Sequence, residues 1–191
     1  MALQYRHRLG RRIIEAVSGK NLEAYFRERI FTRLGMVDTA YNPPEDRQRR
    51  LAVVHRRRSD GTFQVEPTQP PTAVTQFIGG GGLASTAPDY IRFLRMLLNE
   101  GTLDGARIVS ADTVATMGRN HIGSVGVRAA KTAMPERSSD FTFVADGRDK
   151  WGIGFMITAD GKPGGWGAGS LNWAGSTTHT SGSIRRAALS V

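Results

Sequence analysis

The sequence predicts an α+β domain of helices and short strands. Apolar residues recur with helical spacing over 9–17, 22–34 and 90–98, whereas 151–158 and 171–173 have the short alternating pattern of strands. Helices and strands do not alternate strictly along the chain, which favours an α+β class or an incomplete α/β arrangement. With 191 residues, 39% hydrophobic and 23% charged, the chain has the composition of one globular domain.

The first 35 residues predict two helices. The first has an apolar face (Leu9, Ile13, Ile14 and Val17) and ends at Gly19. The second begins after the N-cap Asn21 and ends at Gly35, with an apolar residue at every fourth position: Leu22, Phe26, Ile30 and Leu34.

The middle of the chain predicts a loop at 41–44 and a long charged surface segment over 45–76 with one short strand. Four glycines, 79–82, form a turn before a helix that ends at Gly101. Thr86 and Asp89 have the spacing of a capping box at the start of this helix.

The last third predicts fewer regular elements. Ser110 caps a short helix that includes Val114 and Met117, and residues 119–149 are irregular. A strand over 151–158 is followed by a glycine-rich turn, and Leu171 begins another strand.

Composition excludes several kinds of protein. The chain has no cysteine, so disulfides and thiolate nucleophiles are excluded, and its four dispersed histidines do not have metal-ligand spacing. We therefore expect neither a metal nor another cofactor. No apolar run is long enough to span a bilayer and no signal peptide is recognisable, so we expect no membrane association and a cytoplasmic location for the chain as it stands.

Much of the net charge of +9 lies in the first 60 residues, which include an arginine cluster: Arg47, Arg49, Arg50, Arg56, Arg57 and Arg58. We interpret the cluster as a solvated surface rather than a nucleic-acid site, because it has no interleaved aromatic residues and no recognisable nucleic-acid motif. A basic, non-enzymatic binding module remains the alternative interpretation.

No complete catalytic motif is present. The chain has no G-x-S-x-G elbow, and no serine is followed by lysine three positions later. Lys131-Thr132-Ala133 lacks the glycine of a Lys-Thr-Gly motif, and we attribute the match to chance. The constellation of Ser85, His121 and Asp89 is a second possible hydrolase site, although its spacing matches no known motif.

Several ordered segments resemble the class C β-lactamases and the related penicillin-binding-protein-like esterases and transesterases. They include Arg29-Ile30-Phe31-Thr32-Arg33-Leu34-Gly35-Met36, Gly80-Gly81-Gly82-Leu83-Ala84-Ser85-Thr86-Ala87-Pro88-Asp89-Tyr90, Gly152-Ile153-Gly154-Phe155 and Trp173-Ala174-Gly175. Because the segments occur in the family's order at about its spacing, the resemblance covers roughly residues 8–175.

The resemblance implies a serine hydrolase that acts on small esters, amides or lactams through an acyl-enzyme. The family's third motif maps onto Trp173, Ala174 and Gly175, and the backbone N–H of Ser176 would complete the oxyanion hole. Lactamases have lysine where this chain has Trp173, so the resemblance favours an esterase over an efficient lactamase. Ordinary core packing is the alternative role for Trp173.

The same resemblance predicts that residues 1–175 are part of a larger domain with the β-lactamase/transpeptidase-like fold. In this partial fold, helices pack on an antiparallel sheet that lacks its N- and C-terminal strands. The family's Ser-x-x-Lys segment would lie upstream of Met1, and its catalytic tyrosine would map near Ala2, three residues from Tyr5. We therefore assign no catalytic residue within the chain and expect it to be inactive alone. The oligomeric state is left open.

Residues 176–191 do not continue the family pattern, because their polar sequence lacks strand alternation. If each codon began one base earlier, codon degeneracy would permit the aromatic strand that the family has at this position. A frameshift after Gly175 therefore predicts a missense tail, and genuine divergence is the competing explanation.

Overall fold

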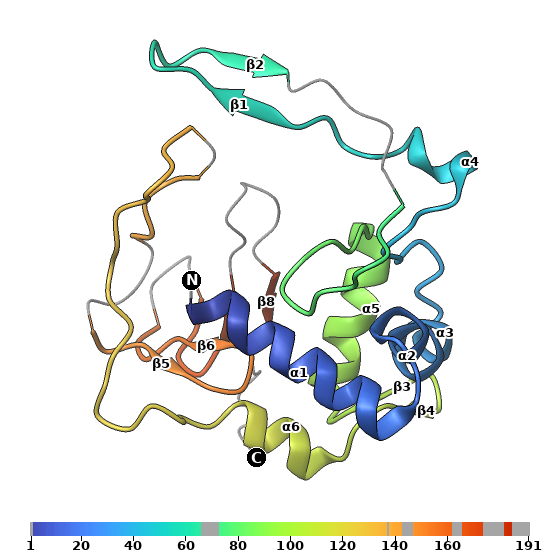
Figure 1. Cartoon of the computed structure of the whole chain (residues 1–191). Coiled ribbons are helices and arrows are strands. Elements are labelled where there is room, and N and C mark those ends of the chain that lie inside the picture. Colours follow the sequence, from blue (N-terminus) through green and yellow to red (C-terminus); the bar gives the residue numbers. More distant parts are fainter. Residues whose placement is uncertain are drawn as a thin grey trace. The chain divides into compact units, whose positions relative to one another are not determined.

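The computed structural model contains helices and small antiparallel sheets, which confirms the α+β class (Figure 1). The structure describes residues 2–65, 73–136, 138–142, 147–161, 166–173 and 182–184. The chain divides into two compact units. Unit 1 comprises Met1–Val54, Glu66–Met96 and Thr102–Ile108, and unit 2 comprises His55–Val65, Leu97–Gly101 and Val109–Val191.

The first helix, α1, spans Ala2–Ser18 and ends before Gly19, which has a φ of 67°. The predicted end is therefore confirmed, while the helix begins earlier than its apolar pattern indicated. Its apolar face is open to solvent, with Leu9 62%, Ile13 56% and Val17 85% exposed.

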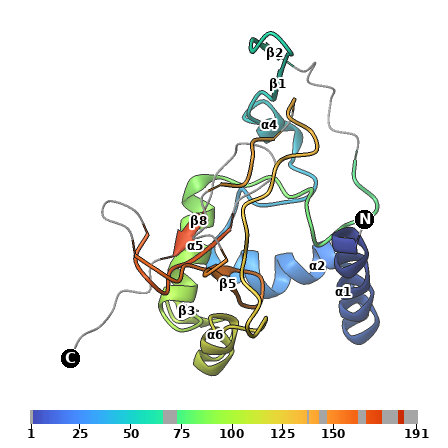
Figure 2. The same ribbon diagram turned by 90° about the vertical axis from the view of Figure 1, so that its left-hand side faces the viewer.

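The second predicted helix contains a π-helical turn. It consists of α2 (Leu22–Phe26), η1 (Arg27–Phe31) and α3 (Thr32–Leu34), and Figure 2 shows α2 between α1 and α5. Both predicted ends are confirmed: the Asn21 side chain accepts a hydrogen bond from the N–H of Ala24, and Gly35 is left-handed with a φ of 64°.

The π turn changes which apolar side chain of this helix is buried. Its additional residue shifts the face by one position. Phe31 is therefore buried, whereas Ile30, which the fourfold spacing predicts on the apolar face, is only half-buried. Phe31 contacts Phe26 edge to face, with ring centroids 6.0 Å apart.

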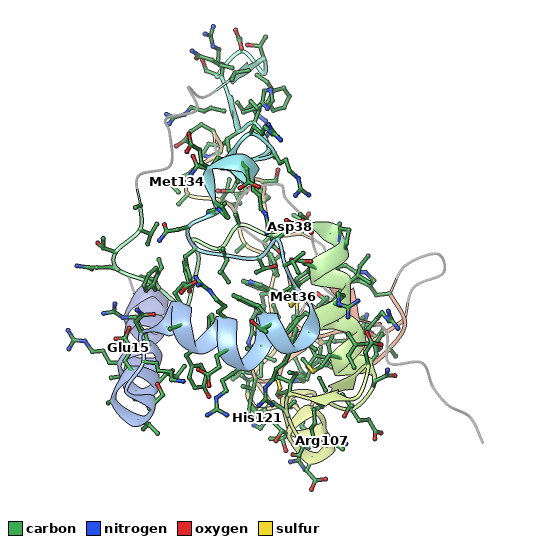
Figure 3. All side chains as sticks on the ribbon, turned by 90° about the vertical axis from the view of Figure 1, so that its right-hand side faces the viewer. Glu15, Met36, Asp38, Arg107, His121 and Met134 are labelled. Atoms are coloured by element: carbon green, nitrogen blue, oxygen red, sulfur yellow. The ribbon has the colours of Figure 1, made fainter. Side chains whose placement is uncertain are left out.

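Helix α5, Ala87–Leu98, is tied to the loop after α3 by one buried carboxylate. Asp89, only 4% exposed, accepts hydrogen bonds from the N–H of Asp38 at 2.7 Å and from Thr39 Oγ1 at 2.8 Å. Figure 3 marks Asp38 in this loop. Only one of the two hydrogen bonds of the predicted capping box is formed. The Asp89 N–H donates to Thr86 Oγ1 at 3.4 Å, whereas the Asp89 carboxylate bonds to the loop at Asp38 and Thr39 instead of the N–H of Thr86.

A second link within unit 1 comes from Arg92 on α5. Its guanidinium donates to the carbonyl of Leu34 and, at 2.8 Å, to Asp104. Asp104 lies in the turn between β3 (Thr102–Leu103) and β4 (Ala106–Arg107). Arg92 therefore connects the end of α3 to this hairpin.

The charged segment after residue 44 contains more structure than its sequence predicts. A short helix, α4, spans Glu45–Gln48. The single expected strand is instead a hairpin of β1 (His55–Arg57) and β2 (Phe63–Val65), whose residues are all exposed.

Unit 2 contains helix α6 (Ala111–Met117), capped by Ser110 as predicted, and a four-stranded antiparallel sheet. The sheet order is β5-β6-β7-β8, in which the strands span Lys150–Trp151, Met156–Ile157, Leu171–Trp173 and Gly182–Ile184.

Two expectations for this sheet are wrong. Residues 151–158 form a hairpin rather than one strand, because the chain reverses at Gly154, where φ is 82°. Part of the polar tail also forms a strand, since β8 pairs with β7. Backbone pairing does not require the apolar alternation on which the sequence prediction depended.

Replacing Asp89 with alanine should lower the free energy of unfolding by about 2–3 kcal/mol, because two buried donors lose a charged acceptor. Urea denaturation followed by circular dichroism measures this change. Asp46→Ala is the matched control, since Asp46 is exposed and should change stability by less than about 0.5 kcal/mol. Equal effects of the two variants would contradict the assigned role of Asp89.

Candidate functional site

Trp173, the first residue of the predicted third motif, is the last residue of β7. It pairs with Gly182 of β8 and is 43% exposed. Ala174, Gly175 and Ser176 lie outside the described residues, so the predicted oxyanion N–H of Ser176 stays a prediction.

The Trp173 ring belongs to an aromatic cluster of three side chains, which also contains Trp151 and Phe141. The Trp151 ring meets Trp173 edge to face, with centroids 4.8 Å apart. The Phe141 ring lies on Trp173 at 6.3 Å in a tilted arrangement. Edge-to-face and tilted pairs at these distances are favourable ring contacts. The cluster therefore fixes Trp173 although nearly half of its surface is open.

Helix α6 holds the Trp151 end of the cluster in place. The carbonyl of Met117 accepts a hydrogen bond from the N–H of Ile153 at 3.0 Å, and the N–H of His121 donates to the carbonyl of Trp151 at 2.8 Å. Gly152 permits this approach, because a Cβ at that position would lie 2.0 Å from the Met117 oxygen. The absence of a side chain at Gly152 is thus needed for the close contact.

Strand β7 rests on buried polar side chains. Asn172, fully buried, donates from Nδ2 to Thr158 Oγ1 at 2.9 Å. Asn172 Oδ1 and Ser170 Oγ are buried without a hydrogen-bond partner among the described residues. Ser170-Leu171-Asn172 is a Ser-x-Asn triplet that the sequence interpretation missed, although its spacing alone would have revealed it. With exposures of 1% and 0%, Ser170 and Asn172 support the strand rather than face a substrate.

No hydrogen bond among the described residues links Ser85, His121 and Asp89 to one another, so the structure shows no catalytic triad there. Ser85 Oγ and the Asp89 carboxylate both bond to Thr39 Oγ1, at 2.7 and 2.8 Å. His121 lies in unit 2, where its Nε2 is 2.8 Å from the carbonyl of Thr116. Each of the three groups thus has a local structural partner.

Tyr41 and Tyr90 have raised pKa values, which is the wrong direction for a catalytic base. Burial raises the pKa of Tyr90, and burial together with the Glu23 carboxylate raises the pKa of Tyr41. The Tyr41 hydroxyl donates to the carbonyl of Ile78 at 2.7 Å. A catalytic tyrosinate would need the opposite shift. The side chain of Tyr5 is not described.

The remaining candidate groups have structural contacts. Thr132, in the partial Lys-Thr match, bonds to Asp140 and Ser138 within its own loop. Arg47 and Arg50 of the arginine cluster both pair with Asp38. Whether the rest of the cluster is simply a solvated surface stays a prediction.

Within the described ranges, no three His, Cys, Asp or Glu side chains gather as a group that could hold a metal ion. Likewise, no helix among the described residues has the length and apolar character needed to cross a membrane.

The β-lactamase family matches residues 6–188 of the chain. Protein Rv1367c of Mycobacterium tuberculosis is 37% identical over 55% of this chain and 27% of its own length. Lovastatin esterase of Penicillium rubens is 27% identical over 88% of this chain and 43% of its own length. The chain therefore spans less than half the length of these curated relatives.

Solved structures support the fold. A mutant of simvastatin synthase (LovD) from Aspergillus terreus superimposes with a TM-score of 0.70 over 92% of this chain and 44% of that chain, at 22% identity. The hydrolase EstCE1 superimposes with a TM-score of 0.59 over 85% of this chain and 42% of that chain. The chain thus has a partial version of the fold of these larger proteins.

Replacing Gly152 with alanine should lower the free energy of unfolding by about 1–3 kcal/mol, because the added methyl group overlaps the Met117 carbonyl. It should also shift tryptophan emission to longer wavelength as Trp151 is displaced. Gly10→Ala is the matched control: Gly10 lies in α1 with open space around it, so alanine should stabilise by about 0.5–1 kcal/mol. Unchanged stability and emission in Gly152→Ala would disprove the close contact.

Proposed function

Because this chain belongs to the β-lactamase family, we propose that it supplies the third-motif part of a serine esterase site. The Ser-x-x-Lys nucleophile would come from polypeptide outside these 191 residues, since none of the serines here has that spacing. The short coverage of its relatives, 27% and 43% of their lengths, supports this division of the site.

In the complete site, the serine oxygen attacks the carbonyl carbon of an ester and the alcohol leaves with a proton. The resulting acyl-enzyme is then hydrolysed by water. The N–H groups of the nucleophile and of Ser176 would donate to the oxygen that becomes negative in the tetrahedral intermediate. Such preorganised donors contribute because they stabilise charge that develops only in the transition state.

The preference for esters is inferred from the tryptophan at position 173, where a lactamase has lysine. A lactamase places a lysine ammonium at this position, which can pair with the carboxylate of a β-lactam. An indole provides an apolar surface and no cation. The site should therefore favour uncharged esters over carboxylate-bearing lactams.

The exposure of Trp173 argues against plain core packing. Nine apolar side chains of the described core are 6% exposed or less, whereas 43% of Trp173 is accessible. A residue whose only role was to fill the core would be expected to be enclosed as they are.

The 191-residue chain alone should not form an acyl-enzyme. A fluorophosphonate probe, which marks activated serines, should give no more labelling of the folded chain than of the heat-denatured chain. Folded lovastatin esterase is a suitable positive control for the probe. Strong labelling of any serine in the folded chain would show that another residue acts as the nucleophile and would overturn the proposed division of the site.

The coding DNA should be read upstream of Met1, and the polypeptide that joins a Ser-x-x-Lys segment to this chain should be assayed. It should hydrolyse p-nitrophenyl butyrate with a kcat/KM at least about 100-fold above that for nitrocefin, which carries a carboxylate. Trp173→Lys should reduce this ratio by about tenfold, because an ammonium can pair with that carboxylate. Faster turnover of nitrocefin by the unmodified protein would contradict an esterase.

A further inference from the structure

We propose that Trp173, Trp151 and Phe141 form an aromatic recognition surface for the uncharged, apolar group of an ester, and that Trp151 is the residue that positions Trp173. The proposal rests on the proposed function, because it takes β7 to border the substrate site. It adds two further residues, Trp151 and Phe141, from other segments of the chain, and assigns them a role in ester recognition.

The geometry of the rings makes one surface out of three segments. Trp151 ends β5, Phe141 lies in the segment 138–142, and Trp173 ends β7. Trp151 and Phe141 are half-buried, and their ring centroids lie 4.8 and 6.3 Å from that of Trp173. Because two neighbours restrict its ring, the exposed 43% of Trp173 is a preformed apolar surface.

Trp151 is suited to position Trp173 because its own backbone is fixed. Its carbonyl accepts from the N–H of His121, and the following turn bonds to the end of α6. Figure 3 marks His121, which follows α6. A ring on such a fixed strand end restricts the indole that it contacts. Restricting a recognition group before binding lowers the entropic cost of binding.

The rings of the cluster disfavour an anionic ligand. The face of an aromatic ring carries negative charge in its quadrupole, and a carboxylate loses hydration against it.

The test compares two probes that differ only at the end of the acyl chain. Ethyl hexanoate ends in a methyl group, and monoethyl adipate ends in a carboxylate. Isothermal titration of the 191-residue chain should give a Kd for ethyl hexanoate at least about tenfold below that for monoethyl adipate. Equal affinities, or no binding of either probe, would overturn the proposal.

Variants test the role of Trp151. Trp151→Ala should raise the Kd for ethyl hexanoate by about three- to tenfold, the range expected for loss of one aromatic pair. Trp151→Phe should retain most of the affinity, because a smaller ring can still contact Trp173. Phe63→Leu is the control: Phe63 is an exposed aromatic residue on β2 and should not affect binding.

The near-ultraviolet circular dichroism of the tryptophans is the second readout. Trp151→Phe and Trp173→Gln should each remove the signal of the edge-to-face pair, but only Trp173→Gln should abolish preference for the neutral probe. Should Trp151→Ala fail to fold, Trp173→Gln decides alone, since Trp173 is half exposed and tolerates a polar side chain. An unchanged preference in Trp173→Gln would disprove the recognition surface.

These outcomes are separable from those for the proposed function. Probe binding requires neither the nucleophile nor turnover. If the chain binds the neutral probe selectively but the longer polypeptide hydrolyses no ester, the proposed esterase function is refuted and the proposed recognition surface stands. If the longer polypeptide hydrolyses esters but the chain binds both probes equally, only the proposed recognition surface is refuted.

Discussion

The hydrogen bond between the Met117 carbonyl and the N–H of Ile153 determines where the aromatic cluster of unit 2 lies. It satisfies a carbonyl at the end of α6 that has no partner within the helix. The same bond places the β5–β6 turn, and with it Trp151, against one end of the helix. Since Trp151 restricts Trp173, the chemistry proposed for the third motif depends on a backbone contact that contains no catalytic residue.

The helices were predictable because their signals are local. Asn21, Gly35 and Ser110 act within one turn of the positions they cap, so short stretches of sequence contain the information. The end predicted at Gly101 is wrong, because α5 ends at Leu98. The π turn was not predictable in this way, because the fourfold apolar spacing fits a regular helix equally well. The burial of Phe31 in place of Ile30 follows from this turn.

The sheet and the candidate site were only partly predictable, since they depend on contacts between distant segments. The motif position of Trp173 follows from the sequence, but its contacts with Trp151 and Phe141 do not. Asp89 illustrates the same limit: local spacing predicts a helix cap, whereas its carboxylate bonds to residues about 50 positions earlier. Strand β8 was missed because paired backbones tolerate a polar sequence.

The π turn in η1 is, in effect, a one-residue insertion that the helix has absorbed without breaking. Removing one residue from η1 would therefore convert its turn into a regular α-helical turn, and the residues on either side would keep their relative positions. Met36 would stay buried, and the N–H of Asp38 would keep its bond to Asp89. In a regular helix each residue turns the chain by about 100°, so the same deletion there would rotate the following segment.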